Sequence, residues 1–175
     1  MDISINAPNP TVANSVLSTV ATLPRVFIPE GGGLRLQSGP GRDLIFKVTG
    51  EDTAGAFDYF IIEVAPRGGP PLHIHHKQDE TLHVVKGQFK VRVGDQVFRM
   101  GKGDFAYLPV NVPHAFLNLT DEPGELIATY VPGGGHHFYR ELAPLARGEK
   151  RDQAAIAQVF AKHGMTLLGP PLSRD

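Results

Sequence analysis

Short segments of alternating apolar and polar residues, separated by glycine- and proline-rich turns, make up most of this chain. Such alternation is typical of strands that bury one face. Between residues 44 and 131 it predicts strands at 44–49, 57–64, 72–76, 80–86, 88–93, 96–100, 105–108, 114–119 and 125–131. The Gly94-Asp95 pair is a signal for a two-residue hairpin. Many short strands at this spacing predict an antiparallel β-sandwich or barrel.

The two ends of the chain depart from this pattern. Residues 11–23 fit either a strand or a short helix. Residues 153–163 predict a helix, because helix formers and an apolar stripe lie between Asp152 as N-cap and Gly164 as terminator. An apolar tail stiffened by prolines follows at 167–172. The expected organisation is an N-terminal extension, a β-barrel, and a C-terminal helix with its tail, at residues 1–39, 40–132 and 133–175.

Composition narrows the function classes. With 175 residues, the chain suits one domain with a proper core. A formal net charge of −1 offers no attraction for nucleic acid or anionic membrane. No apolar run approaches the ~20 residues needed to span a bilayer, and no signal peptide is recognisable, so we expect a cytoplasmic protein. The chain has no cysteine, which excludes disulfides and thiolate metal sites, so any metal must rest on histidine and carboxylate.

The segment from Pro70 to Glu80 carries the strongest candidate chemistry. Alternate residues of a strand share a face, so His73 and His75 project from one side of a sheet. A turn after His75 brings Glu80 back beside the two imidazoles. Two neutral nitrogens and one carboxylate are ligand chemistry for a divalent metal with open positions.

A second segment, from Gly103 to Asn118, supplies another histidine, His114, at a strand start. Together the two segments resemble the motifs of the cupin superfamily. The first motif reads Gly, five residues, His-x-His, three or four residues, Glu, six residues, Gly, and here Arg67 holds the position of its first glycine. The second reads Gly, five residues, Pro-x-Gly, two residues, His, three residues, Asn, and here Asn111 replaces the central glycine. Asparagine tolerates the left-handed conformation, so we expect that turn to persist.

The cupin resemblance covers residues 40–132 and implies an all-β fold, a small jelly-roll barrel with a metal inside and a C-terminal helix outside. It implies that His73, His75, Glu80 and His114 hold one divalent ion. The bland alternative is a structural histidine cluster, or a cupin that has lost its metal. Sequence cannot choose among Fe, Mn, Ni, Co, Cu and Zn, because the same ligands accept each of them.

Several other residues are candidates for a ligand pocket. A barrel interior is apolar with few polar groups, which suits a small aromatic ligand, although core packing explains most of these positions equally well. The candidate pocket residues are Leu82, Phe89, Phe105, Tyr107, Phe116, Asn118 and Tyr130. His76 and His83 fall on the opposite face from the ligands. His136 and His137 follow a glycine loop and are either plain loop residues or a cover for the barrel mouth.

Two functions from different classes remain open. The segment from Pro70 to Gly87 and the C-terminal helix and tail are similar to small quercetin-dioxygenase-like cupins. That similarity implies a metal-dependent dioxygenase for a small enolic, flavonol-like substrate, with Glu80 as metal ligand and catalytic base. The alternative is an isomerase or a small-molecule or sugar binder that never activates oxygen. We also expect a homodimer, because the apolar outer face of the strand around Ala115, Leu117 and Leu119 requires cover.

Overall fold

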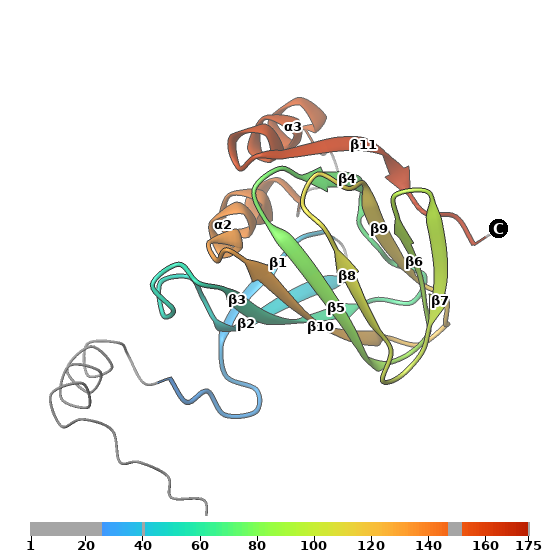
Figure 1. Ribbon diagram of the computed structural model, residues 1–175, viewed down its shortest axis with the longest axis horizontal. Coiled ribbons are helices and arrows are strands. Elements are labelled where there is room, and N and C mark those ends of the chain that lie inside the picture. Colours follow the sequence, from blue (N-terminus) through green and yellow to red (C-terminus); the bar gives the residue numbers. More distant parts are fainter. Residues whose placement is uncertain (1–25, 40, 147–151, 175) are drawn as a thin grey trace, which may run out of the picture.

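The computed structural model describes residues 26–39, 41–146 and 152–174, and it consists of two antiparallel sheets that face each other (Figure 1). The predicted all-β jelly-roll architecture is confirmed. The first sheet has the strand order β1-β2-β3-β10-β5-β8. Its strands are β1 (Leu34–Gln37), β2 (Arg42–Val48), β3 (Asp58–Val64), β10 (Gly124–Val131), β5 (Asp79–Lys86) and β8 (Phe105–Leu108).

The second sheet has the order β11-β4-β9-β6-β7. Its strands are β11 (Met165–Pro171), β4 (Pro71–His75), β9 (His114–Asn118), β6 (Phe89–Val93) and β7 (Gln96–Met100). Sequential neighbours such as β4 and β5 lie in different sheets, so the turn between them carries the chain from one layer to the other. Side chains from the two layers meet in one core, which includes Phe60, Leu82, Phe89 and Phe116.

Two helices close one end of this core. They are α2 (Gly135–Ala146) and α3 (Gln153–Lys162). Both lie outside the strands, and β11 runs alongside α3 (Figure 1). Phe138 of α2 and Phe160 of α3 are buried and pack edge to face, with ring centroids 4.8 Å apart. The helices therefore add an aromatic cover to the barrel.

The helix predicted at 153–163 is present, and Asp152 caps it by accepting a hydrogen bond from the Ala155 amide. Three elements were not predicted. Helix α2 was missed because the glycines at 133–135 and Pro144 disguise an apolar stripe at helical spacing. Strand β11 was missed because Pro170 and Pro171 lie in it; it is an edge strand, where proline is tolerated. Strand β1 is the third element. Residues 11–23, expected as a strand or a short helix, lie outside the described residues.

Both departures from the glycine motif positions adopt the backbone conformation of the residue they replace. Asn111 has φ +64° and Arg67 has φ +58°, both in the left-handed region. The turn before His114 therefore persists with asparagine, as expected. Arg67 keeps its turn as well, and its guanidinium pairs with Asp121.

The outer face of β9 is already covered within the single chain. Ala115 and Leu117 are both buried, so of the three residues that suggested a second subunit there, only the half-buried Leu119 keeps part of its surface exposed. The homodimer itself stays a prediction. Among the described residues, no helix has the length and apolar character required to cross a membrane.

The close approach of the chain before β4 to β9 generates a first prediction. A Cβ at Gly69 would lie 2.0 Å from the Phe116 carbonyl oxygen, so Gly69→Ala must push β4 away from β9. We expect the free energy of unfolding to fall by about 1–3 kcal/mol, the usual cost of overpacking. Chemical denaturation measures it.

The matched control is Gly101→Ala. A Cβ at Gly101 meets no atom of the described residues within 4 Å. The free energy of unfolding should therefore change by no more than about 0.5 kcal/mol. Equal stability of the two variants would contradict the close approach.

Candidate metal centre

Four buried side chains that carry metal-ligand atoms meet where the two sheets face each other. His73 and His75 come from β4 and His114 comes from β9, and the strand register places His73 directly opposite His114. Glu80 comes from β5 in the other sheet. The turn after His75 thus returns Glu80 to the imidazoles, as the sequence predicts.

The four residues are close enough to share one ion. One ligand atom from each lies within 4.8 Å of the others. A Glu80 carboxylate oxygen, Oε2, lies 3.2 Å from His114 Nε2 and 4.0 Å from His75 Nδ1. Two ligands of a tetrahedral ion bound at ~2.0–2.1 Å are themselves about 3.3 Å apart, so these separations suit a shared metal.

Backbone carbonyls orient two of the imidazole rings. His73 Nδ1 lies 2.8 Å from the Pro71 carbonyl oxygen, and His114 Nδ1 lies 2.9 Å from the Val112 carbonyl oxygen. A carbonyl only accepts, so each Nδ1 carries the proton and each Nε2 presents a lone pair to the cavity. Metal-bound histidines in proteins are commonly held this way.

Burial favours the neutral form of two of the three imidazoles, those of His73 and His75. It lowers the pKa of His73 to about 3, with a smaller contribution from the charge of His114. It also lowers the pKa of His75 well below the usual value. His75 Nδ1 and His114 Nε2 are buried and have no hydrogen-bond partner among the residues that the structure describes. Unpaired buried nitrogens are costly, and a bound cation would satisfy both, so the group fits a metal ion.

Comparison with known proteins agrees with this geometry. Residues 60–130, which include all four of these side chains, match the family model described as a cupin domain. The chain thus carries a cupin domain over this segment.

Individual relatives of this cupin are distant. Quercetin 2,3-dioxygenase of Bacillus subtilis is 22% identical over 111 residues, which are 59% of this chain and 33% of that protein. The chain therefore spans about a third of this curated relative. KdgF from a Halomonas species superposes with a TM-score of 0.57 at 18% identity, covering 65% of this chain and 99% of that one. An RmlC-like cupin from Shewanella frigidimarina gives 0.55 at 20% identity, with 65% and 96% covered. The two solved structures show the fold alone.

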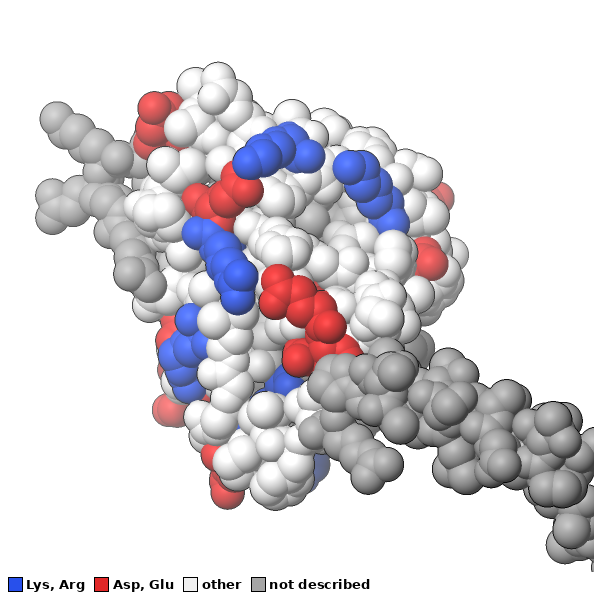
Figure 2. All heavy atoms as spheres, turned by 90° about the vertical axis from the view of Figure 1, so that its left-hand side faces the viewer, with Lys and Arg blue, Asp and Glu red and all other residues white. Residues whose placement is uncertain are grey.

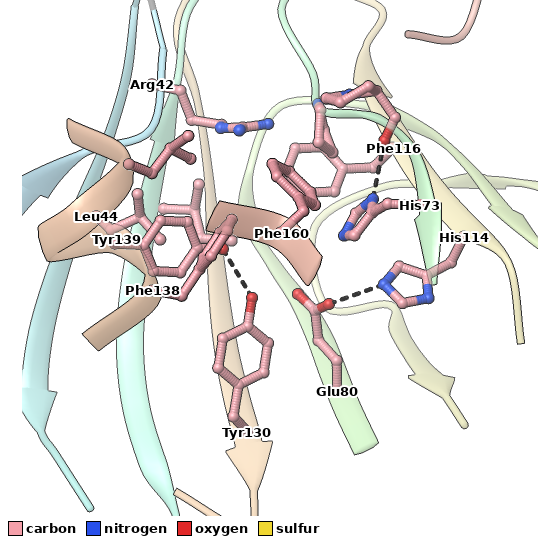
Figure 3. Close-up of a pocket in the computed structure, with 14 residues that line it drawn as sticks. Arg42, Leu44, His73, Glu80, His114, Phe116, Tyr130, Phe138, Tyr139 and Phe160 are labelled. Carbon is pink, nitrogen blue, oxygen red and sulfur yellow. Dashed lines mark hydrogen bonds and ion pairs between the residues drawn. The ribbon is translucent and has the colours of Figure 1, made fainter. Parts of the chain in front are cut away.

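The cupin's candidate metal group opens into a small cavity that other polar groups share (Figure 3). Arg42 and Tyr139 lie across this cavity from His114. The Tyr130 and Tyr139 hydroxyls are 2.7 Å apart and hydrogen-bonded. Apolar side chains from β2, β3, β9 and the two helices complete the wall, which includes Leu44, Ile62, Phe116, Phe138, Leu142 and Phe160. The cavity volume is about 30 Å³, room for a few water-sized groups.

The structure distributes the predicted pocket residues over three locations. Phe116 and Tyr130 line the cavity. Leu82, Phe89 and Asn118 are buried but lie away from it, in the core. Asn118 has a structural role, because its amide group donates to the Glu122 and Ala65 carbonyls.

Phe105 and Tyr107 do not line the cavity, contrary to prediction. They are 61% and 53% exposed. In β8 they pair with His83 and Thr81 of β5, and residues paired in this way share a face. His83 is exposed, so Phe105 and Tyr107 also point outward. The strand at 105–108 was predicted with its faces reversed.

Sequence reasoning missed two residues of this region. Arg42 reaches the cavity from the start of β2. The sequence does indicate this position, because Arg42 alternates with Leu44 and Phe46 and therefore shares their face of the strand. Asp79 lies at the start of β5. Its carboxylate accepts hydrogen bonds from the Val110 amide and the Tyr107 hydroxyl, which anchors the loop leading to His114. Nothing in the local pattern indicates that contact.

The geometry predicts that His75→Ala abolishes metal binding at the barrel centre. The substitution removes one of the three imidazoles and opens the centre to water. Elemental analysis of protein loaded with a divalent ion and then dialysed measures the remaining metal. The variant should bind one ion per chain fewer than wild type, the ion of the barrel centre.

The matched control is His76→Ala, one residue along. His76 faces outward, where its ring lies 2.8 Å from the Asn111 side-chain oxygen and 2.9 Å from the Thr166 hydroxyl. We expect this variant to keep the metal. Full occupancy in His75→Ala would show that the ligand assignment is wrong.

A third prediction concerns the stability of metal-free protein in acid. The pKa of His73 is about 3 in the folded protein and 6.5 as the ordinary value. Between these values the unfolded chain binds a proton that the folded protein does not, so the free energy of unfolding falls as the pH drops from 6.5 toward 3. Urea denaturation across this range should show a shallower pH dependence in His73→Asn than in His83→Asn. Identical slopes in the two variants would contradict the pKa shift of His73.

Proposed function

We propose that this cupin is a metal-dependent enzyme of the dioxygenase type that acts on a small enolic or phenolic anion. The main support is the buried group of three imidazoles and one carboxylate beside a cavity that also contains a cation, Arg42. Such ligands leave a divalent ion with a residual charge of about +1, which attracts an anionic oxygen. The sequence similarity to a quercetin 2,3-dioxygenase supports the reaction type.

His73, His75, His114 and Glu80 would hold the ion. When bound, it would supply a Lewis acid and, if redox-active, a centre for dioxygen chemistry. Glu80 has a further role in this proposal. It is buried beside the cavity, so its carboxylate is placed to take the proton of a substrate hydroxyl and leave the substrate as an oxyanion.

Arg42 would bind the remote end of the substrate. The Arg42 Nε donates to the Ser38 hydroxyl, 2.5 Å away, and Nη2 donates to the Ser38 carbonyl, 3.1 Å away, so the side chain is held in place. The guanidinium points into the cavity (Figure 3). An arginine oriented in this way suits a carboxylate or enolate oxygen.

The tyrosine pair provides a neutral donor. Burial raises the pKa of Tyr139 to about 12 and raises the pKa of Tyr130 well above its usual value, so both keep their protons near neutral pH. Only one of the two protons is used in the hydrogen bond between the hydroxyls. The other can be donated to a bound oxygen.

The cavity limits the size of the substrate. Typical ligand pockets measure roughly 300–1,000 Å³, and this one measures about 30 Å³. A flavonol does not fit this cavity unless α2 and α3 move, so the observed cavity does not support a flavonol-like substrate. A compact enol or keto acid fits the observed space and charge better.

The alternative is a Lewis-acid enzyme or binding protein that never uses oxygen. Arg42 favours it, because a cation opposite the metal group suits a carboxylate ligand regardless of the reaction. Oxygen consumption separates the two functions. We would measure oxygen uptake by native metal-loaded protein with a panel of small enols, and turnover with and without air. Tight binding of such a compound without oxygen consumption would overturn the proposed dioxygenase activity.

Glu80→Gln provides the first mechanistic prediction. Glutamine keeps the size and one oxygen ligand but cannot act as a carboxylate base. Metal should be partly retained, and turnover at matched metal content should fall by roughly 10²-fold or more. Glu122→Gln is the control, because Glu122 is exposed. Turnover unchanged by Glu80→Gln would remove Glu80 from the proton transfer.

Arg42→Gln provides the second mechanistic prediction. Loss of the guanidinium should raise the KM of an anionic substrate about ten-fold or more, the value of one charged hydrogen bond. Ser38→Ala is the matched control. It removes the hydroxyl that accepts from Arg42 Nε but keeps the cation. An increase in KM that is equal for a neutral substrate analogue would indicate a structural role for Arg42 instead.

A further inference from the structure

A second group of metal-ligand side chains lies outside the barrel cavity. His136 and His137 form the first turn of α2, and Glu51 lies in the loop between β2 and β3. One ligand atom from each lies within 4.8 Å of the others. Figure 2 looks onto the side of the molecule from which this loop protrudes in Figure 1, and acidic side chains lie near the middle of that face.

A buried carboxylate holds this group together. Asp58 is fully buried at the start of β3. One of its oxygens, Oδ1, accepts from the Gly50 amide at 2.6 Å, and the other, Oδ2, accepts from the amides of Gly134 and Gly135 at 2.9 and 2.6 Å. Asp58 therefore ties the loop that carries Glu51 to the start of the helix that carries the two histidines.

Asp58 also orients the His136 ring. Its Oδ1 lies 3.3 Å from His136 Nδ1. With the Nδ1 proton directed to this carboxylate, the Nε2 atom of a neutral ring presents a lone pair. Carboxylate–histidine pairs of this kind are the usual support of a metal-bound imidazole.

The Nε2 atom of His136 has no hydrogen-bond partner within the described part of the chain, although the residue is 0% exposed. It lies 3.4 Å from Glu51 Oε1, and His137 Nε2 lies 3.8 Å from the same oxygen. These separations are close to the ~3.3 Å edge of a tetrahedron of ligands around an ion at ~2.0–2.1 Å. Glu51 and His137 have half-exposed side chains, so an ion can reach the group and keep water as a further ligand.

We propose that His136, His137 and Glu51 form a second binding site for a divalent ion of the zinc type, separate from the barrel centre. Two imidazoles and one carboxylate with an open position are a common set for Zn²⁺ and for similar ions such as Co²⁺. The ion would link the β2–β3 loop to the first turn of α2. Because α2 supplies Phe138, Tyr139 and Leu142 to the barrel cavity, the link would hold that wall of the cavity in place.

A proton is the competing occupant. A doubly protonated His136 between Asp58 and Glu51 would also satisfy Nε2, without any ion. The groups that face the His136 ring nitrogens are these two carboxylates, and the ring of His137 lies at a centroid distance of 4.0 Å. Only a metal ion uses His137 as well as Glu51, and this difference makes the two occupants distinguishable.

The experiment counts zinc ions on the full chain. Chelator-treated protein is dialysed against micromolar Zn²⁺, and bound zinc is measured by elemental analysis for wild type, His75→Ala, Glu51→Gln and His137→Ala. We expect two ions per chain in wild type and one in each variant. In His75→Ala, added Zn²⁺ should still raise the melting temperature, and Glu51→Gln in the same background should remove that shift.

Glu141→Gln is the matched control. Glu141 also faces a histidine whose Nε2 atom is buried, with Oε1 3.2 Å from His163 Nε2, but its other partner is Lys162 rather than a second histidine. This variant should keep both ions. One ion in wild type that His75→Ala removes would overturn the second site while leaving the barrel centre intact. Two ions retained in both Glu51→Gln and His137→Ala would overturn it as well.

Discussion

The structure depends on the burial of three imidazoles and one carboxylate where its two sheets meet. Each buried ring nitrogen without a partner costs on the order of 1–3 kcal/mol, which the fold must offset elsewhere. The two sheets share the group unequally, with all three histidines on one and Glu80 on the other. The four ligand-type residues therefore meet only when the two sheets pack together, and separating the sheets would disrupt the group.

Much of the surrounding structure fixes the positions of these four groups. Carbonyls two residues before His73 and His114 set their ring orientations. On the outer face, Asp79 fastens the Val110 amide, and the His76 side chain contacts Asn111 and Thr166. These outward-facing residues hold the loop before β9 in place. They act on the ligand positions without entering the cavity.

Helix α2 connects the two clusters of ligand-type residues. Its first turn carries His136 and His137 beside Glu51, and its next residues, Phe138 and Tyr139, line the barrel cavity. The Tyr139 hydroxyl contacts Tyr130, which lies opposite Glu80 in the β5–β10 register. A short path of packed residues thus runs from the outer cluster to the carboxylate of the barrel centre. Any ion that fixes the first turn of α2 would act on the cavity through this path.

The sequence by itself determined the strands from β2 to β10, the helix at 153–163 and the spacing of the four metal-ligand residues. It could do so because period-two alternation, capping residues and motif spacing are local properties. The left-handed turn at Asn111 also belongs to this class.

Only the tertiary structure decided what closes the barrel and what faces its cavity. Arg42 enters the cavity because β2 pairs with β3, and Phe105 and Tyr107 turn outward because β8 pairs with β5 in a register that places them beside His83 and Thr81. The aromatic cover comes from α2 and α3, where a glycine run and a proline hide the helical pattern of α2. The meeting of Glu51, Asp58 and His136 joins residues as many as 85 positions apart in the sequence (136 − 51 = 85). Such contacts depend on which elements pack together, and local residue patterns do not encode that.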